Sequence, residues 1–118
     1  MSPSRGDRCD RGVATMLTVG VLALLLMTAA TGVGVVQVVA ARHAAGGAAD
    51  LGALAGASEQ RHADRCAAAV VVVRANDAEP VSCRATGDAV LVTAAVRTEA
   101  LLGLRWTLRA SARAGPVR

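Results

Sequence analysis

The longest apolar run of the chain extends from Val13 to Ala41 and contains no charged residue. Gln37 is its only strongly polar member. At about 1.5 Å of rise per residue, a helix of this length exceeds the ~30 Å hydrocarbon core of a bilayer. The run therefore predicts a transmembrane helix over residues 13–41. Because this helix is longer than spanning requires, we expect Val36 to Ala41 to project into the membrane interface.

The charges that flank the apolar run predict its orientation. Three arginines lie on its short N-terminal side: Arg5, Arg8 and Arg11. Only Arg42 lies immediately beyond its other end. Because positively charged flanks stay in the cytoplasm, residues 1–12 form a basic cytoplasmic leader. Residues 42–118 then form an extracytoplasmic stalk helix and small domain, and the chain is a single-pass protein of the cell membrane.

A cleavable secretory signal is the competing interpretation of the same run. Thr28-Ala29-Ala30 or Val38-Val39-Ala40 could serve as a small-residue cleavage site. The apolar region of such a signal is normally about 7 to 15 residues long, however, which is much shorter than this one. Either interpretation exports the remainder of the chain.

Beyond the membrane, residues 42 to about 60 are rich in alanine and predict a helical continuation of the span. Within it, small residues recur at every fourth position on one helical face: Ala48, Gly52 and Gly56. Such spacing permits close helix packing, so these three residues are helix-packing candidates. A partner-binding stripe and a solvent-exposed stalk are both compatible with this pattern.

A second, shorter helix is predicted from Cys66 to Ala75. Four residues share one stripe of this helix: Cys66, Ala69, Val70 and Val73. The valine run at 70–73 also suits a buried strand, but we favour the helix. Asn76 to Pro80 breaks the pattern and predicts a loop.

A β-hairpin is predicted from Val81 to Arg97, with its turn at Gly87-Asp88. Pairing Thr86 with Ala89 places the apolar residues of both strands on one face. The remaining pairs are then Ala85 with Val90, Cys83 with Val92 and Val81 with Ala94. In this register Cys83 faces the core.

The C-terminal segment alternates strictly between apolar and polar residues, which predicts a half-buried strand. Its buried positions are Trp106, Leu108, Ala110 and Ala112, and its outward positions are Arg105, Thr107, Arg109, Ser111 and Arg113. The arginine row is a solvated face that protects a sheet edge, or it meets an acidic partner or lipid headgroups. The complete pattern predicts an α+β protein with a long N-terminal helix, a short helix and an antiparallel sheet of about three strands.

The proposed topology separates the three cysteines. Cys9 precedes the membrane helix, whereas Cys66 and Cys83 follow it. In an oxidising compartment the exported pair most simply forms a disulfide, which stabilises a small domain by roughly 3 kcal/mol in the chain-entropy model. A metal site would recruit His62 with these two thiols, but it lacks a fourth ligand and paired C-x-x-C spacing.

Composition excludes several classes of function. The chain has 118 residues and a net charge of +4, all 13 basic residues are arginine, and Trp106 is the only aromatic residue. Scattered arginines without stacking aromatics do not indicate a nucleic-acid-binding protein. With two histidines, His43 and His62, and no phosphate loop or nucleophile elbow, the sequence does not predict an enzyme, a cofactor or a small-molecule substrate.

Three features together resemble the TadE-like family of tight-adherence pilus assembly proteins, in particular its short Arg- and Ala-rich actinobacterial members. They are Arg11-Gly12 before the apolar helix, the segment Arg42-His43-Ala44-Ala45-Gly46-Gly47-Ala48-Ala49-Asp50-Leu51-Gly52-Ala53-Leu54-Ala55 after it, and the Cys66 to Cys83 spacing before a terminal strand ending in Ala-Gly-Pro. The most specific part is the Arg-x-x-Ala…Ala-Asp-Leu-x-Ala-Leu-Ala pattern.

The resemblance implies a pseudopilin-like component of a pilus or secretion apparatus. By this analogy a prepilin peptidase removes the leader between Gly12 and Val13, and the apolar helix packs against other pilin-like membrane proteins. The chain departs from the pattern at Leu17, where pilin-like segments usually carry glutamate. The alternative is a free-standing, membrane-tethered or secreted binding domain unrelated to pili.

Overall fold

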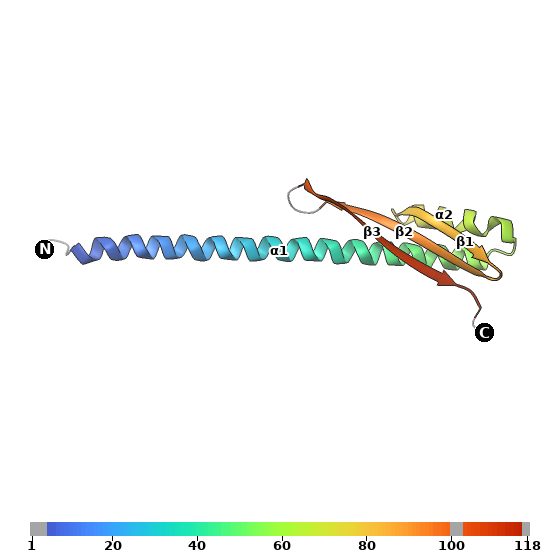
Figure 1. The fold of residues 1–118 in the computed structure, drawn as a ribbon, viewed down its shortest axis with the longest axis horizontal. Helices are drawn as coiled ribbons and strands as arrows, with labels where there is room; N and C mark the ends of the chain where they lie inside the picture. The colour runs from blue at the N-terminus through green and yellow to red at the C-terminus, as the bar shows by residue number, and fades with distance from the viewer. Residues whose placement is uncertain (1–4, 100–102, 117–118) are drawn as a thin grey trace. The chain divides into compact units, whose positions relative to one another are not determined.

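The computed structural model describes residues 5–99 and 103–116 and has an α+β architecture (Figure 1). A long helix, α1 (Arg5–Ser58), is followed by a short 3₁₀ helix (His62–Asp64) and a second helix, α2 (Arg65–Ala75). Strands β1 (Glu79–Thr86), β2 (Ala89–Glu99) and β3 (Arg105–Ala114) complete the chain. The predicted fold class is confirmed.

The chain divides into two compact units, with the boundary between Val35 and Val36. In the first unit, α1 exposes its apolar side chains from Val13 onward. Its backbone groups are paired by the helix itself, so no other element is needed to satisfy them. The predicted continuation of this helix into the C-terminal unit is confirmed, because α1 runs without interruption to Ser58.

In the second unit, α2 confirms the helix predicted from Cys66 to Ala75 and buries Ala69 and Val73. Asp77, with a φ of 56°, ends the helix, and the Ala78 amide donates to the Val73 carbonyl at 3.2 Å. The loop predicted as far as Pro80 is shorter than expected, because β1 already begins at Glu79. β1 is an edge strand, where a proline is tolerated.

The three strands pair antiparallel in the order β1-β2-β3. The predicted hairpin is confirmed, including the pairs Thr86 with Ala89 and Cys83 with Val92. The predicted pair of Val81 with Ala94 is wrong. The register shifts between Pro80 and Ser82, so that Pro80 pairs with Ala94 and the side chain of Val81 is 44% exposed. A bulge of this kind inserts one unpaired residue, which alternation alone does not reveal.

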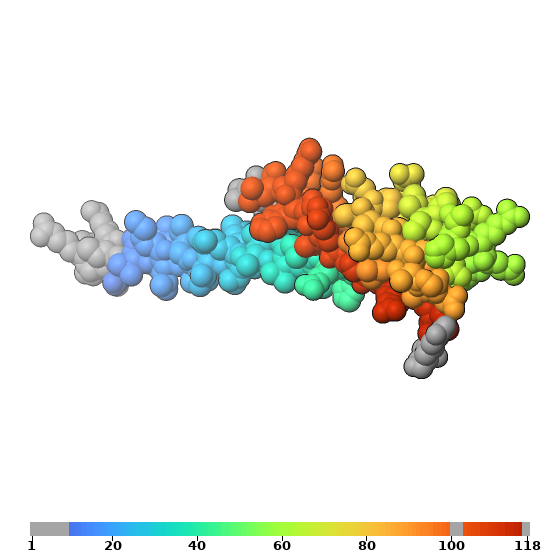
Figure 2. All heavy atoms as spheres, turned by 45° about the vertical axis from the view of Figure 1, so that its right-hand side comes forward, coloured from blue at the N-terminus to red at the C-terminus, as the bar shows by residue number. Residues whose placement is uncertain are grey.

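The core of the second unit lies between α1, α2 and the sheet, and it consists of alanine and valine. Its largest fully buried side chains are Val73, Val90 and Val92. Figure 2 shows the sheet lying against α1 in this unit. Side chains this small fill the interior only if the backbones approach closely.

Strand β3 follows the predicted alternation along most of its length, with Leu108, Ala110 and Ala112 half-buried and the intervening residues exposed. Trp106, predicted on the buried face, is instead 52% exposed. The pairing of β1 with β2 ends at Ala95, whereas β2 and β3 continue to the pair Glu99 with Arg105. Trp106 therefore lies in a two-stranded ribbon that β1 does not reach.

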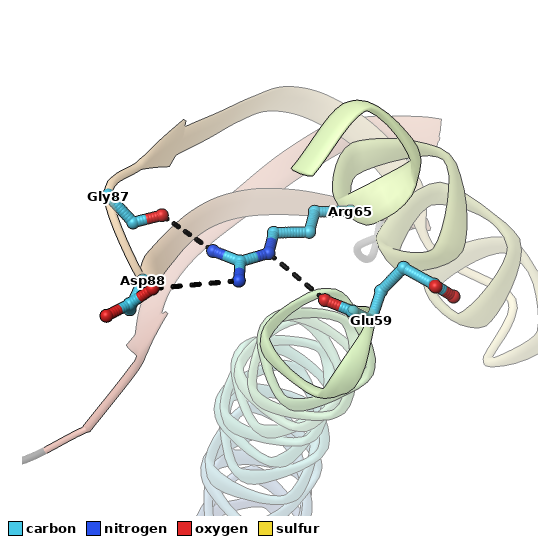
Figure 3. A network of polar contacts seen from close by, with 4 residues as sticks. All are labelled: Glu59, Arg65, Gly87 and Asp88. Atoms are coloured by element: carbon cyan, nitrogen blue, oxygen red, sulfur yellow. Dashed lines mark hydrogen bonds and ion pairs between the residues drawn. The ribbon is translucent and has the colours of Figure 1, made fainter. Parts of the chain in front are cut away.

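Arg65, at the first position of α2, links three segments of the second unit (Figure 3). Its guanidinium donates to the Glu59 carbonyl at 3.2 Å and to the Gly87 carbonyl at 2.6 Å, and it lies 3.9 Å from the Asp88 carboxylate. Only 11% of the Arg65 side chain is exposed. One cation thus connects the chain after α1 with the β1–β2 turn.

Gly56 provides a test of the close packing. A Cβ atom at this position would lie 2.9 Å from the Arg65 carbonyl oxygen and 3.1 Å from Val90 Cγ1, whereas one at Gly47 would meet nothing within 4 Å. We expect Gly56→Ala to lower the free energy of the unfolding that exposes the β2 amides by about 1–3 kcal/mol, because the added methyl group overpacks the interior. Gly47→Ala should raise it by about 0.5–1 kcal/mol through helix propensity. Hydrogen exchange of the β2 amides in the full chain measures both, and equal stabilisation by the two substitutions would contradict the close packing.

Candidate functional site

Among the described residues, α1 is the one helix that is long and apolar enough to span a membrane. None of its most apolar stretch is buried. Leucine and methionine side chains such as Leu17, Leu26 and Met27 are each at least two-thirds exposed. An apolar surface of this extent on a single helix requires cover by lipid or by other apolar helices.

The hydroxyl groups within the apolar part of α1 are satisfied by the helix itself. Thr15, Thr18 and Thr31 each donate to the carbonyl four residues earlier, at 2.8–2.9 Å, and Thr28 donates to the carbonyl of Leu25 at 2.9 Å. Because hydrocarbon offers no hydrogen-bond partner, this local pairing removes the cost of placing threonine in a bilayer. These threonines are therefore compatible with a lipid-facing helix.

The predicted cleavage position lies inside α1. Gly12 and Val13 are both helical, and Val13 and Leu17 are exposed. A peptidase would therefore have to unwind the helix locally to reach the Gly12–Val13 bond. Residues 1–4 of the leader, together with the side chains of Arg5, Arg8 and Cys9, lie outside the described part of the structure.

The small-residue stripe of α1 faces other elements of the same chain. Ala48, Gly52 and Gly56 are all buried. A Cβ atom at Gly52 would lie 2.6 Å from Val73 Cγ2 and 3.2 Å from the Ala69 carbonyl oxygen. α2 and β2 thus pack against the stripe. The stripe is neither a solvent-exposed face nor a free partner-binding surface in this structure, because it packs within the chain.

Cys66 of α2 and Cys83 of β1 are joined by a disulfide, with their Cα atoms 5.7 Å apart. The bond ties α2 to the edge strand of the sheet. His62, which the metal alternative would recruit, is exposed, and the described residues contain no group of three or more His, Cys, Asp or Glu side chains that could hold a metal ion.

The outward face of the sheet carries the predicted arginine row: Arg105, Arg109 and Arg113. Exposed ion pairs join Arg105 to Glu99 at 3.8 Å and Arg97 to Glu79 at 3.5 Å. Further along β2 and β3, the paired residues Thr93 and Ser111 have their Oγ1 and Oγ atoms 2.7 Å apart. Exposed pairs of this kind contribute little to stability. Their side chains keep the outer face of the sheet polar and accessible.

Two features of the structure were not predicted from the sequence. The Arg65 guanidinium donates to the Glu59 carbonyl, six residues earlier, and to the Gly87 carbonyl, 22 residues later, and no local pattern signals either contact. The exposure of Trp106 was also missed. The predicted terminal strand is longer than the predicted first strand of the hairpin. This difference in length would have indicated that one end of the terminal strand extends beyond the first strand.

The family model of putative Flp pilus-assembly TadE/G-like proteins matches residues 12–59. Residues 12–59 are therefore similar to this family. The TadE/G-like segment comprises the apolar part of α1 and the whole small-residue stripe, and it ends one residue after α1. It covers less than half of the 118 residues, and α2 and the sheet lie outside it. No curated protein and no solved structure matches the chain.

The disulfide supports a core that contains no side chain larger than valine. We expect the double substitution Cys66→Ser with Cys83→Ser to lower the free energy of unfolding by about 3 kcal/mol, because the unfolded chain gains loop entropy. Hydrogen exchange of the β1 and β2 amides in the full chain measures this loss. Cys9→Ser is the matched control and should leave protection unchanged. An intact mass that does not rise by two hydrogens on reduction would exclude the bond.

Proposed function

We propose that this chain is a membrane-anchored, pseudopilin-like structural or assembly component of a pilus or secretion apparatus. The observation that carries the proposal is the TadE/G-like match, which coincides with the apolar helix and its small-residue continuation. The description of that family names pilus assembly. The chain would therefore act through helix packing and anchoring.

In the proposed topology, residues 1–12 lie in the cytoplasm, residues 13–41 span the membrane and residues 42–118 lie outside. Arg5, Arg8 and Arg11 on the N-terminal side support this direction. The Cys66–Cys83 disulfide supports it as well, because such bonds persist in oxidising compartments. The domain boundary at residue 41 is part of this proposal.

The partners that we propose are membrane lipid and other pilin-like membrane proteins. The side chains available to them are the exposed apolar ones of α1. Leu17 provides no carboxylate, so the helix inserts without a charged partner and would pack by shape and apolar contact alone. Assembly through this helix requires neighbours that also offer apolar helical surface.

A photo-crosslinking side chain placed at Leu24 tests assembly through α1. In cells that assemble the apparatus, we expect Leu24 to crosslink to pilin-like membrane proteins, because it is exposed on the apolar helix. Val71 of α2 is similarly exposed but belongs to the C-terminal domain, and it serves as the control position. Protein adducts identified by mass spectrometry should form at Leu24 and not at Val71. A chain that remains monomeric in mild detergent, with lipid adducts only, would instead favour the free-standing tethered domain.

The N-terminus of the mature protein tests the proposed processing. If a prepilin-type peptidase acts, the mature chain begins at Val13, as measured by N-terminal sequencing and intact mass of protein extracted from membranes. Gly12→Leu should block cleavage because it fills the open position next to the scissile bond, whereas Gly6→Leu should not. A start near Thr31 or Ala41 would show ordinary secretion, and a start at Met1 would show an unprocessed anchor.

A further inference from the structure

Two large apolar side chains are exposed at the free end of the β2–β3 ribbon. Leu104 is 57% exposed and Trp106 is 52% exposed, and Arg105 between them is also exposed. Glu99, which pairs with Arg105 across the ribbon, supplies the one carboxylate of this end among the described residues. The core of the second unit does not use these side chains, so they remain available to a partner.

The position of this ribbon end follows from how β2 packs on α1 in the second unit. Val90 lies against Gly56 and Val92 lies against Gly52, so β2 runs antiparallel to α1. From Val90 to Thr98, which pairs with Trp106, the strand advances by about 27 Å, or about 18 residues of helix. This advance brings the Trp106 pair to the turn of α1 that includes Val38 and Ala41.

The burial of α1 supports this placement. Ala45 is fully buried and Ala41 is 7% exposed, so the strands and α2 of the second unit cover its part of α1 as far back as Ala41, close to Val36 where the unit begins. Figure 1 shows the ribbon of β2 and β3 extending beyond β1 and α2. The ribbon end is therefore at the side of the unit where α1 enters it, which is also where the apolar run of the sequence ends.

We propose that Leu104, Arg105 and Trp106 form a second membrane contact, which docks the end of the β2–β3 ribbon into the interfacial layer of the bilayer. This inference rests on the proposed membrane span of α1. Tryptophan prefers this layer because its ring is apolar and its N–H finds a polar partner there. The Leu104 side chain reaches the acyl boundary, and the Arg105 guanidinium binds headgroup phosphate.

The chemistry of the ribbon end favours lipid over a protein neighbour. A protein interface core is depleted in charge, whereas here an exposed arginine separates the two apolar side chains. A headgroup layer accepts both kinds of side chain, because phosphate lies immediately above the hydrocarbon. The docked ribbon would hold the C-terminal unit against the membrane surface from which α1 emerges.

The chain offers a direct probe of this contact, because Trp106 is its only tryptophan and it has no tyrosine or phenylalanine. The full chain is reconstituted into vesicles of phosphatidylcholine and phosphatidylglycerol, and integrated protein is isolated by flotation after alkaline extraction. We expect Trp106 emission to lie at shorter wavelength than in the denatured chain. Lipids brominated near the headgroup should quench it, and the vesicles should protect it from acrylamide.

Matched variants separate docking from general membrane binding. Leu104→Ser should reduce the quenching by brominated lipid, whereas Leu91→Ser should not, because Leu91 is 43% exposed but lies near the opposite end of β2. Arg105→Gln should lower the ratio of docked to undocked ribbon by roughly fivefold, and more weakly in vesicles without phosphatidylglycerol. Arg113→Gln, on the same strand and away from the ribbon end, should leave the ratio unchanged.

The outcomes distinguish the inference from the proposed function. A chain that does not float with the vesicles overturns both. A chain that floats, with Trp106 open to acrylamide and unquenched by brominated lipid, overturns the membrane contact and leaves the anchor intact. Emission that shifts only as protein density rises, without lipid quenching, overturns it in favour of contact with a neighbouring copy.

Discussion

The close approach of α1 to α2 and β2 is the constraint on which the C-terminal unit depends. Glycine at positions 52 and 56 leaves room for the backbone carbonyls of α2 and the valines of β2, and any larger side chain there meets them. The interior contains alanine and valine, so it cannot fill a wider gap. The spacing of small residues on one helix therefore determines the separation of all layers of the unit.

A thin core needs support from other interactions, and the chain provides three, two at the beginning of α2 and one at its end. At its beginning, the Arg65 guanidinium connects the chain after α1 with the β1–β2 turn, and the Cys66–Cys83 bond ties the same turn of helix to β1. At its other end, the Ala78 amide returns to the helix at Val73. α2 is thus fixed along its length although its buried surface is small.

Features that depend on local periodicity were predictable from the sequence, and features that depend on distant contacts were not. The apolar run, the short helix and the hairpin register at Thr86 and Cys83 each follow from side-chain spacing and turn chemistry. The bulge at Val81 does not, because an inserted residue leaves the pattern of the flanking strands unchanged. The exposure of Trp106 depends on where β1 stops pairing, and the intramolecular role of Gly52 and Gly56 depends on where α2 folds back. The sequence shows which face of a helix carries apolar or small residues, but it does not show which element packs against that face.

The position of the Cys66–Cys83 bond has a mechanical consequence. A force that pulls the anchored helix away from the C-terminal strand enters the fold through α1 and leaves it through β3, and neither element contains a bonded cysteine. The segment between the two cysteines is closed by the bond, so it adds nothing to the extended length. The two cysteines have a sequence separation of 17, so the bond shortens the contour length of the fully extended chain by roughly 60 Å. Under tension, α1 and β3 would therefore separate from the unit first. The disulfide would keep α2 and β1 together, and the rest of the unit could refold around them.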